Sequence, residues 1–186
     1  MREPGKNSDR RSGAAVECAA GEQAVVDPRI VRFIGRHRVM TLATVGAGLS
    51  QAGGAQAAGE AEEGEVWCCN LFYAYMAPGG DFPGGAFVFT SPADTRHAAF
   101  MVANPRVAGS IVLESKVVGR LQGLQFCGSV CRADSSPELL EEAKRGYLKR
   151  FPFAAPMLSD LWVLSLSRLK YTDNTLGFGT KLIWNQ

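Results

Sequence analysis

The residues best suited to chemistry form a cluster of hydroxyl, guanidinium and imidazole side chains within residues 87–105. They are Thr90, Ser91, Thr95, Arg96 and His97. The pattern predicts a short apolar strand, a polar turn and a helix that ends at Asn104, before Pro105. The cluster then lies at the positive end of the helix dipole, where hydroxyl and guanidinium donors suit a phosphate. Ordinary helix capping by Ser91 or Asp94 explains the same residues equally well, so both interpretations stay open.

Dinucleotide binding, zinc binding and nucleophilic catalysis find little support elsewhere in the chain. The glycine-rich stretch 46–51 places Gln51 where a dinucleotide-binding turn requires a small residue. The cysteines are Cys18, Cys68, Cys69, Cys127 and Cys131. Adjacent cysteines point to opposite faces of a strand, and we interpret all five as small buried side chains rather than metal ligands. Of the two histidines, His97 lies beside Arg96 with no nucleophile motif nearby. We expect no metal site.

Length and composition describe an ordinary globular domain. The 186 residues are 46% apolar and 20% charged, with a formal net charge of +2. This charge is too small for nucleic-acid binding as the main function. No apolar run approaches the roughly 20 residues that span a bilayer, and the N-terminus lacks the apolar segment of a secretory signal. We therefore expect a cytoplasmic protein without nucleic-acid or membrane partners.

Turn residues and apolar spacing predict mainly strands, with three helices among them. Residues 1–25 lack periodicity and are predicted to form a disordered tail, followed by one domain at 26–186. The predicted strands cover 39–45, 65–75, 86–90, 107–113, 124–130 and 162–166. The predicted helices lie near 28–37, 95–104 and 136–151, and glycine-rich loops cover 46–64 and 77–85. The second strand is aromatic-rich and compatible with burial on both faces. This order predicts a mainly β fold, an antiparallel barrel or sandwich with flanking helices.

Several motifs resemble those of a known group of proteins. They are WCCNLFY (67–73), TRHA (95–98), GLQFCG (123–128), RFP (150–152) and YTDNTLGFGTKLIW (171–184). Over about residues 27–186 the chain resembles the FMN-binding split barrels, the pyridoxamine 5′-phosphate oxidase-like proteins. Within that group it is more similar to the uncharacterised bacterial family typified by YhbP.

The resemblance implies a six-stranded antiparallel split barrel that forms a homodimer, with two FMN sites at the subunit interface. The phosphate would be held by Thr90, Ser91, Thr95, Arg96 and His97. The isoalloxazine ring would lie along the second and third strands, with Asn70, Leu71, Phe72 and Tyr73 as the matching stretch. The partner subunit would add contacts from Gln125, Lys181 and Trp184.

Departures from the group's pattern leave the activity open. His97 stands where many members have a lysine, so the permanent positive charge at that position is missing. The substrate-binding residues of true pyridoxamine phosphate oxidases have no counterpart, so we do not assign that reaction. The main expectation is an FMN-dependent oxidoreductase of unknown substrate. Alternatives are a non-catalytic module that binds or senses flavin, deazaflavin or haem, and a structural dimer without cofactor. In that dimer Arg96 pairs with Asp94 or Asp173.

Overall fold

The computed structural model describes residues 25–47, 64–177 and 179–186. The predicted tail, except for its last residue, and positions 48–63 of the first predicted loop lie outside these ranges. The helices are α1 (Pro28–Arg36), α2 (Arg96–Ala103) and α3 (Pro137–Arg150). Short 3-10 turns are η1 (Val118–Arg120), η2 (Ala133–Ser135), η3 (Pro152–Met157) and η4 (Asn174–Leu176). The strands are β1 (Val39–Val45), β2 (Val66–Met76), β3 (Ala86–Thr90), β4 (Arg106–Leu113), β5 (Gln122–Arg132), β6 (Leu161–Asp173) and β7 (Lys181–Asn185).

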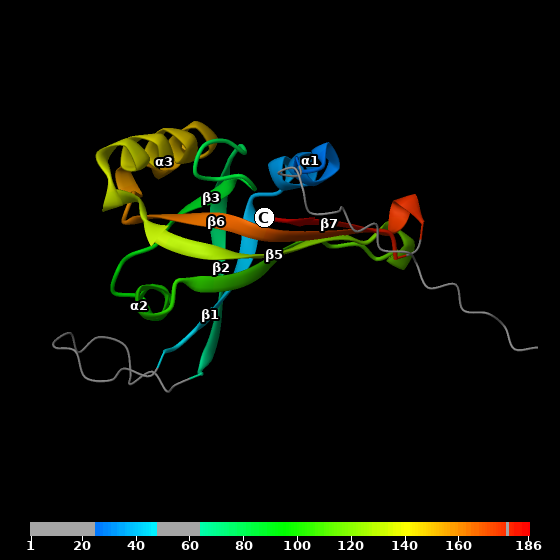
Figure 1. Ribbon diagram of the computed structural model, residues 1–186, viewed down its shortest axis with the longest axis horizontal. Helices are drawn as coiled ribbons and strands as arrows, with labels where there is room; N and C mark the ends of the chain where they lie inside the picture. Colours follow the sequence, from blue (N-terminus) through cyan, green and yellow to red (C-terminus); the bar gives the residue numbers. More distant parts are fainter. Residues whose placement is uncertain (1–24, 48–63, 178) are drawn as a thin grey trace, which may run out of the picture.

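The strands form a closed six-stranded antiparallel barrel (Figure 1). Their order is β3-β2-β1-β4-β5-β6, and β3 also pairs with β6, which closes the ring. β6 does this with its first residues, which pair with β3, while its later residues pair with β7. The predicted six-stranded antiparallel barrel with flanking helices is therefore confirmed. The pattern at 172–186, dense in glycine and aromatic residues, does not predict β7.

Local signals explain where the helices begin. Asp27 accepts a hydrogen bond from the Arg29 amide at 2.8 Å, with Pro28 in the first turn of α1. Ser136 caps α3 in the same way, ahead of Pro137. These two starts are as predicted, because capping oxygens and an initial proline act within a few residues. The cap of α2 is Thr95, whose hydroxyl accepts from the Ala98 amide, and not Ser91 or Asp94.

The buried apolar residues form two clusters on opposite sides of the barrel wall. The larger cluster fills the barrel interior with inward residues such as Leu42, Phe87 and Phe126, and includes residues from α1 and α2. The second lies between α3 and the outer face of β2, β3 and β6, where Val88 and Val163 meet the α3 side chains. β3 is therefore buried on both faces. The polar turn that follows it leads from the barrel into α2.

The middle of the outer face of β2, β1, β4 and β5 carries small and polar side chains, whereas Val39, Val66, Phe72 and Val112 on these strands are exposed apolar residues. Cross-strand pairing aligns Asn70 with Thr41, Thr41 with Ser110 and Ser110 with Gln125. In the neighbouring row Cys68 and Cys127 are exposed, as is Cys131 further along β5. The expectation of buried cysteines is wrong for these three, because α3 packs over Ala74 and Met76 at the end of β2 and over β3 and β6, and leaves these positions uncovered. Cys69 is partly buried, and Cys18 lies outside the described residues. The two-sided burial expected for the second strand is likewise wrong over 66–72, where outward side chains are exposed.

The turn between β6 and β7 is organised by the carboxylate of Asp173, which is 7% exposed. It accepts hydrogen bonds from the Tyr171 hydroxyl at 3.0 Å, from Gln122 Nε2 at 3.0 Å and from the Thr175 amide at 2.9 Å. The Thr175 hydroxyl donates a fourth at 2.6 Å. Burial acts to raise the pKa of Asp173, but the hydrogen bonds outweigh it and hold the pKa below its usual value.

Asp173→Asn is expected to lower the free energy of unfolding by about 2 kcal/mol near neutral pH, because the amide nitrogen cannot accept a hydrogen bond. The folded-state pKa lies below the unfolded one. The stabilisation is therefore fully present above the unfolded pKa and is lost as pH falls through the folded pKa. Urea unfolding of both proteins, at neutral pH and again in acid below the ordinary carboxyl pKa, measures the difference. The gap should shrink in acid, and a constant gap would contradict this account.

Candidate functional site

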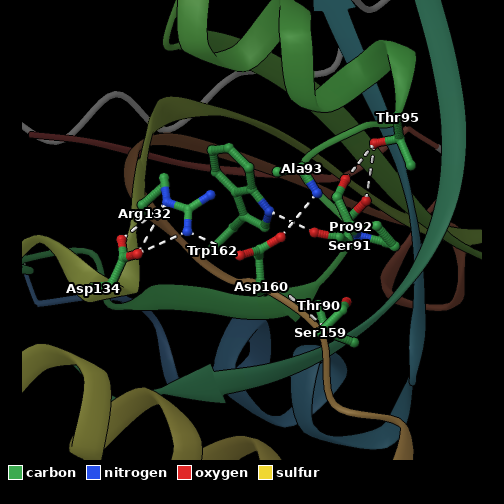
Figure 2. Close-up of polar contacts among 10 residues, drawn as sticks. All are labelled: Thr90, Ser91, Pro92, Ala93, Thr95, Arg132, Asp134, Ser159, Asp160 and Trp162. Atoms are coloured by element: carbon green, nitrogen blue, oxygen red, sulfur yellow. Dashed lines mark hydrogen bonds and ion pairs between the residues drawn. The ribbon is translucent and has the colours of Figure 1, made fainter. Parts of the chain in front are cut away.

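The turn between β3 and α2 is held in place by the beginning of β6 (Figure 2). The Ser91 amide donates to the Asp160 carbonyl at 3.0 Å, and the Ala93 amide donates to the Asp160 carboxylate at 2.9 Å. The indole N–H of Trp162 donates to the Ser91 carbonyl at 3.0 Å. These contacts follow from the pairing of β3 with β6, which brings Thr90 opposite Leu161. The start of α2 is thus fixed before any ligand binds.

Arg132, at the end of β5, completes the support. Its guanidinium donates to the carboxylates of Asp160 at 2.8 Å and Asp134 at 2.7 Å. It also lies 5.6 Å from the centre of the Trp162 ring. Sequence reasoning missed Arg132 and Asp160, because no local spacing connects either residue to the turn. For Trp162 the sequence predicts only that it begins the strand at 162–166.

Three of the five predicted phosphate-binding residues come together in the structure. The Ser91 hydroxyl lies 2.6 Å from His97 Nε2 and 3.2 Å from the Thr95 hydroxyl. The Thr95 hydroxyl also donates to the Pro92 carbonyl at 2.9 Å. Burial lowers the pKa of His97, so the imidazole is neutral at neutral pH and supplies a hydrogen bond rather than a charge. The network therefore caps the helix and also presents polar atoms at its N-terminus.

Arg96 leaves this network and turns toward β2. It forms an ion pair with Glu65, and its guanidinium carbon lies 5.0 Å from the centre of the Trp67 ring and 5.7 Å from that of Phe100. The expected pairing with Asp94 or Asp173 is therefore wrong. Its Nε is buried and has no hydrogen-bond partner among the described residues. A buried donor without an acceptor is costly, so this atom is a place where an anion would be favoured.

Thr90 also separates from the cluster. Its hydroxyl lies 2.8 Å from the Ser159 hydroxyl and 3.2 Å from the Asp160 carbonyl (Figure 2). It faces the segment that leads into β6 rather than His97. The five residues thus form three groups around one turn instead of a single cluster.

The predicted ring-contacting stretch alternates across β2. Asn70 and Phe72 face outward and are exposed, and Asn70 Oδ1 accepts from the Thr41 hydroxyl at 2.9 Å. Leu71 packs against the barrel core. Tyr73 is fully buried and its hydroxyl donates to the Ile34 carbonyl at 2.8 Å. Only the two outward residues offer side chains to a ligand outside the barrel.

The three residues predicted to act across the interface differ in accessibility. Gln125 is exposed on the outer face of β5, opposite Ser110, and Lys181 is exposed on β7. Trp184 is 5% exposed and belongs to the core. A Cβ atom added at Gly84 would lie 2.5 Å from the Trp184 ring, so this tryptophan fills space within its own chain.

The fold and the supported turn define the class of protein as a closed six-stranded antiparallel barrel with flanking helices. A haem-binding protein from Mycobacterium smegmatis aligns with it at a TM-score of 0.60 and 20% identity, over 82% of this chain and 55% of that one. HutZ, a haem storage protein from Vibrio cholerae, aligns at a TM-score of 0.55 and 18% identity, over 76% of this chain and 89% of HutZ. This chain thus spans about half the length of the mycobacterial protein. These likenesses concern the fold.

The chain belongs to the UPF0306 family. It is 34% identical over 157 residues to a UPF0306 protein of Photorhabdus laumondii, which covers 84% of this chain and 94% of that protein. It is 38% identical over 123 residues to the UPF0306 protein YhbP of Escherichia coli. This alignment covers 66% of this chain and 79% of YhbP. No family model matches the sequence. Among the described residues, each helix is too short or too polar to traverse a lipid bilayer.

Proposed function

We propose that this protein binds FMN, with the phosphate at the N-terminus of α2. The observation that carries the proposal is the prearranged network of Ser91, Thr95 and His97 at the start of α2. Arg96 points toward β2, and its buried Nε lacks a partner among the described residues, so its side chain would turn back toward the network to bind the phosphate. A phosphate there would replace the Glu65 carboxylate as the anionic partner of Arg96. It would also face the amides at the start of the helix, which favour negative charge. His97, being neutral, adds a hydrogen bond only.

The proposal includes a homodimer with two FMN sites at the subunit interface. The polar row of Asn70, Thr41, Ser110 and Gln125 on β2, β1, β4 and β5, whose two end residues are exposed, supports this, because short side chains such as those of Thr41 and Ser110 let two sheets approach closely. Gln125 and Lys181, both exposed, would reach the flavin of the second copy. Sedimentation of the flavin-loaded protein tests this part, and a monomer would count against it.

In this proposal the protein is an oxidoreductase of unknown substrate. FMN, when bound, supplies the electron or hydride transfer. The chain's own residues hold and orient it: Ser91 and Thr95 at the phosphate, and the exposed side chains of Asn70 and Phe72 along β2.

Haem binding is the second candidate function. It is favoured because two proteins with a similar barrel are a haem-binding protein and a haem storage protein. Of the two histidines, each has one ring nitrogen engaged: His37 Nδ1 lies 2.8 Å from the Phe33 carbonyl and His97 Nε2 lies 2.6 Å from the Ser91 hydroxyl. An axial ligand would have to come from the free ring nitrogen or another side chain. This makes haem the less direct fit.

The absorption spectrum of freshly purified protein, followed by titration with FMN and with haemin, separates the candidates. Flavin bands or saturable FMN uptake support the first proposal. A Soret band with no FMN uptake supports the second. A colourless protein that takes up neither at high micromolar concentration rejects both.

Arg96→Ala is expected to weaken FMN binding by about 1.5–3 kcal/mol, the usual contribution of a hydrogen bond to a charged group. Glu65→Gln should instead tighten binding, because it removes the carboxylate that competes for Arg96. Isothermal titration with FMN measures both. Arg120→Ala is the control, since Arg120 is an exposed arginine on η1. Unchanged affinity in Arg96→Ala would mean that the phosphate is held elsewhere.

A further inference from the structure

A cavity of about 510 Å³ lies where the end of α3 and the following η3 turn approach the outer face of the barrel. Phe72 of β2, Thr90 of β3 and Arg38, just before β1, line it on the barrel side. Tyr147 and Phe153 line it on the helical side. Figure 1 shows α3 on the side of the barrel where β3 lies. The volume is in the range of pockets that hold small organic molecules.

The cavity is bordered by large apolar side chains that are left exposed. Phe72 is 57% exposed, Phe153 88% and Met157 76%. Phe72 also contacts Phe151 edge to face, with 5.6 Å between the ring centres. Aromatic rings gathered at a hollow favour a planar apolar ligand, because burial would remove their surface from water. A group of exposed apolar residues of this kind commonly marks a binding site.

Positive charge in the cavity is not balanced by its lining, which contains no Asp or Glu. Arg38 is exposed and has no ion-pair partner among residues 25–47, 64–177 and 179–186. Arg150 donates to the carbonyls of Gly35 and His37. Within the same described ranges it too lacks a carboxylate partner, and its buried Nε makes no hydrogen bond. Two guanidinium groups beside aromatic rings are suited to an anionic group on a planar ligand.

Tyr147 adds a hydrogen-bonding group. The residue is 4% exposed and lines the cavity. Its ring packs against Phe151 at 5.1 Å. Its hydroxyl makes no hydrogen bond among the described residues, and it is not fully enclosed by protein atoms. A nearly buried tyrosine with an accessible hydroxyl is positioned to donate to a ligand in the cavity.

We propose that this cavity binds a planar aromatic compound that carries a carboxylate or another anionic group. The rings of Phe72 and Phe153 contact its apolar part, and Arg38, Arg150 and Tyr147 bind the anionic group. Phe72 and Thr90 are also predicted flavin contacts, so the ligand would lie beside the cofactor as the substrate. That role rests on the proposed function, whereas binding itself does not.

The test uses the full flavin-free chain and 1-anilinonaphthalene-8-sulfonate, an aromatic anion that fluoresces when bound in an apolar site. We expect saturable binding of one probe per chain. Arg38→Ala should raise the dissociation constant roughly tenfold, and Tyr147→Phe about threefold, as expected for a charged and a neutral hydrogen bond. Arg120→Ala should bind like the wild type. Circular dichroism of each variant confirms that it is folded.

The outcomes separate this inference from the proposed function. Wild-type affinity in the folded Arg38→Ala and Tyr147→Phe variants would overturn it. Displacement of the probe by FMN, one for one, would also overturn it, because the cavity would then hold the flavin itself. Probe binding that persists with FMN bound supports it. A protein that refuses FMN but shows these two variant effects supports the cavity site while rejecting the flavin proposal.

Discussion

Trp162→Ala is expected to lower the free energy of unfolding by about 4 kcal/mol, the range for removing a large buried aromatic residue. Trp162 is 1% exposed and is among the largest fully buried side chains. Its loss removes the packing of the ring in the barrel interior and the hydrogen bond to the Ser91 carbonyl. The guanidinium of Arg132 also loses the ring beneath it. Urea unfolding followed by circular dichroism measures the change.

Trp162→Phe is the matched control, because it keeps an aromatic ring and removes the indole N–H. The Ser91 carbonyl, in a residue that is 3% exposed, is then left without its donor, at a cost of about 1–2 kcal/mol. In this variant the Ser91 and Ala93 amides should exchange hydrogen faster than in the wild type, because the turn is loosened. Exchange in α3 should change less. A phenylalanine variant as unstable as the alanine variant would show that the hydrogen bond dominates. An alanine variant within about 1 kcal/mol of wild type would contradict this account of the packing.

Gly128→Ala is expected to destabilise the protein by about 3 kcal/mol, near the upper end for overpacking in a core. An added Cβ would lie 2.1 Å from the Ser165 carbonyl oxygen and 2.8 Å from Leu164 Cδ1. The carbonyl belongs to β6, which is paired on both sides, and cannot move aside easily. The site coincides with the irregularity in pairing between Cys127 and Gly128.

Gly123→Ala, on the same strand, is the matched control for this prediction. Its added Cβ would come no closer than 3.6 Å to the Ile111 carbonyl, an ordinary contact. We expect a change within about 0.5 kcal/mol or a small stabilisation, because alanine restricts the unfolded chain more than glycine. Thermal unfolding of the two variants side by side checks the contrast. Equal losses in both would mean that general strand flexibility, and not the close carbonyl, explains the effect.

Features set by neighbouring residues could be predicted from the sequence. Val39–Val45 and Ala86–Thr90 are strands with the predicted bounds. The starts of α1 and α3 follow from Asp27 and Ser136, each placed before a proline. In each case the signal is apolar spacing or a cap that acts over a few positions, so no knowledge of the tertiary fold is required.

Features that depend on distant residues could not be predicted in this way. Arg96 pairs with Glu65, which lies 31 positions earlier in the sequence, and no local pattern indicates this contact. The support of Ser91 by Asp160 depends on the pairing of β3 with β6. The exposure of Cys127 depends on which strands α3 covers. The predicted flavin contacts on both subunits stay predictions, because they concern a ligand and a second chain.

Closure of the barrel also bears on how the chain folds during synthesis. β3 pairs with β2 directly before it in the sequence, but its other neighbour is β6, made much later. Until residues 161–165 leave the ribosome, one edge of β3 has no partner, and its Ala86, Phe87, Val88 and Phe89 side chains cannot be fully buried. An open apolar edge invites pairing with another chain, and such non-local pairing forms slowly. The nascent protein therefore passes through a stage in which it is prone to aggregate, and release of β6 ends it.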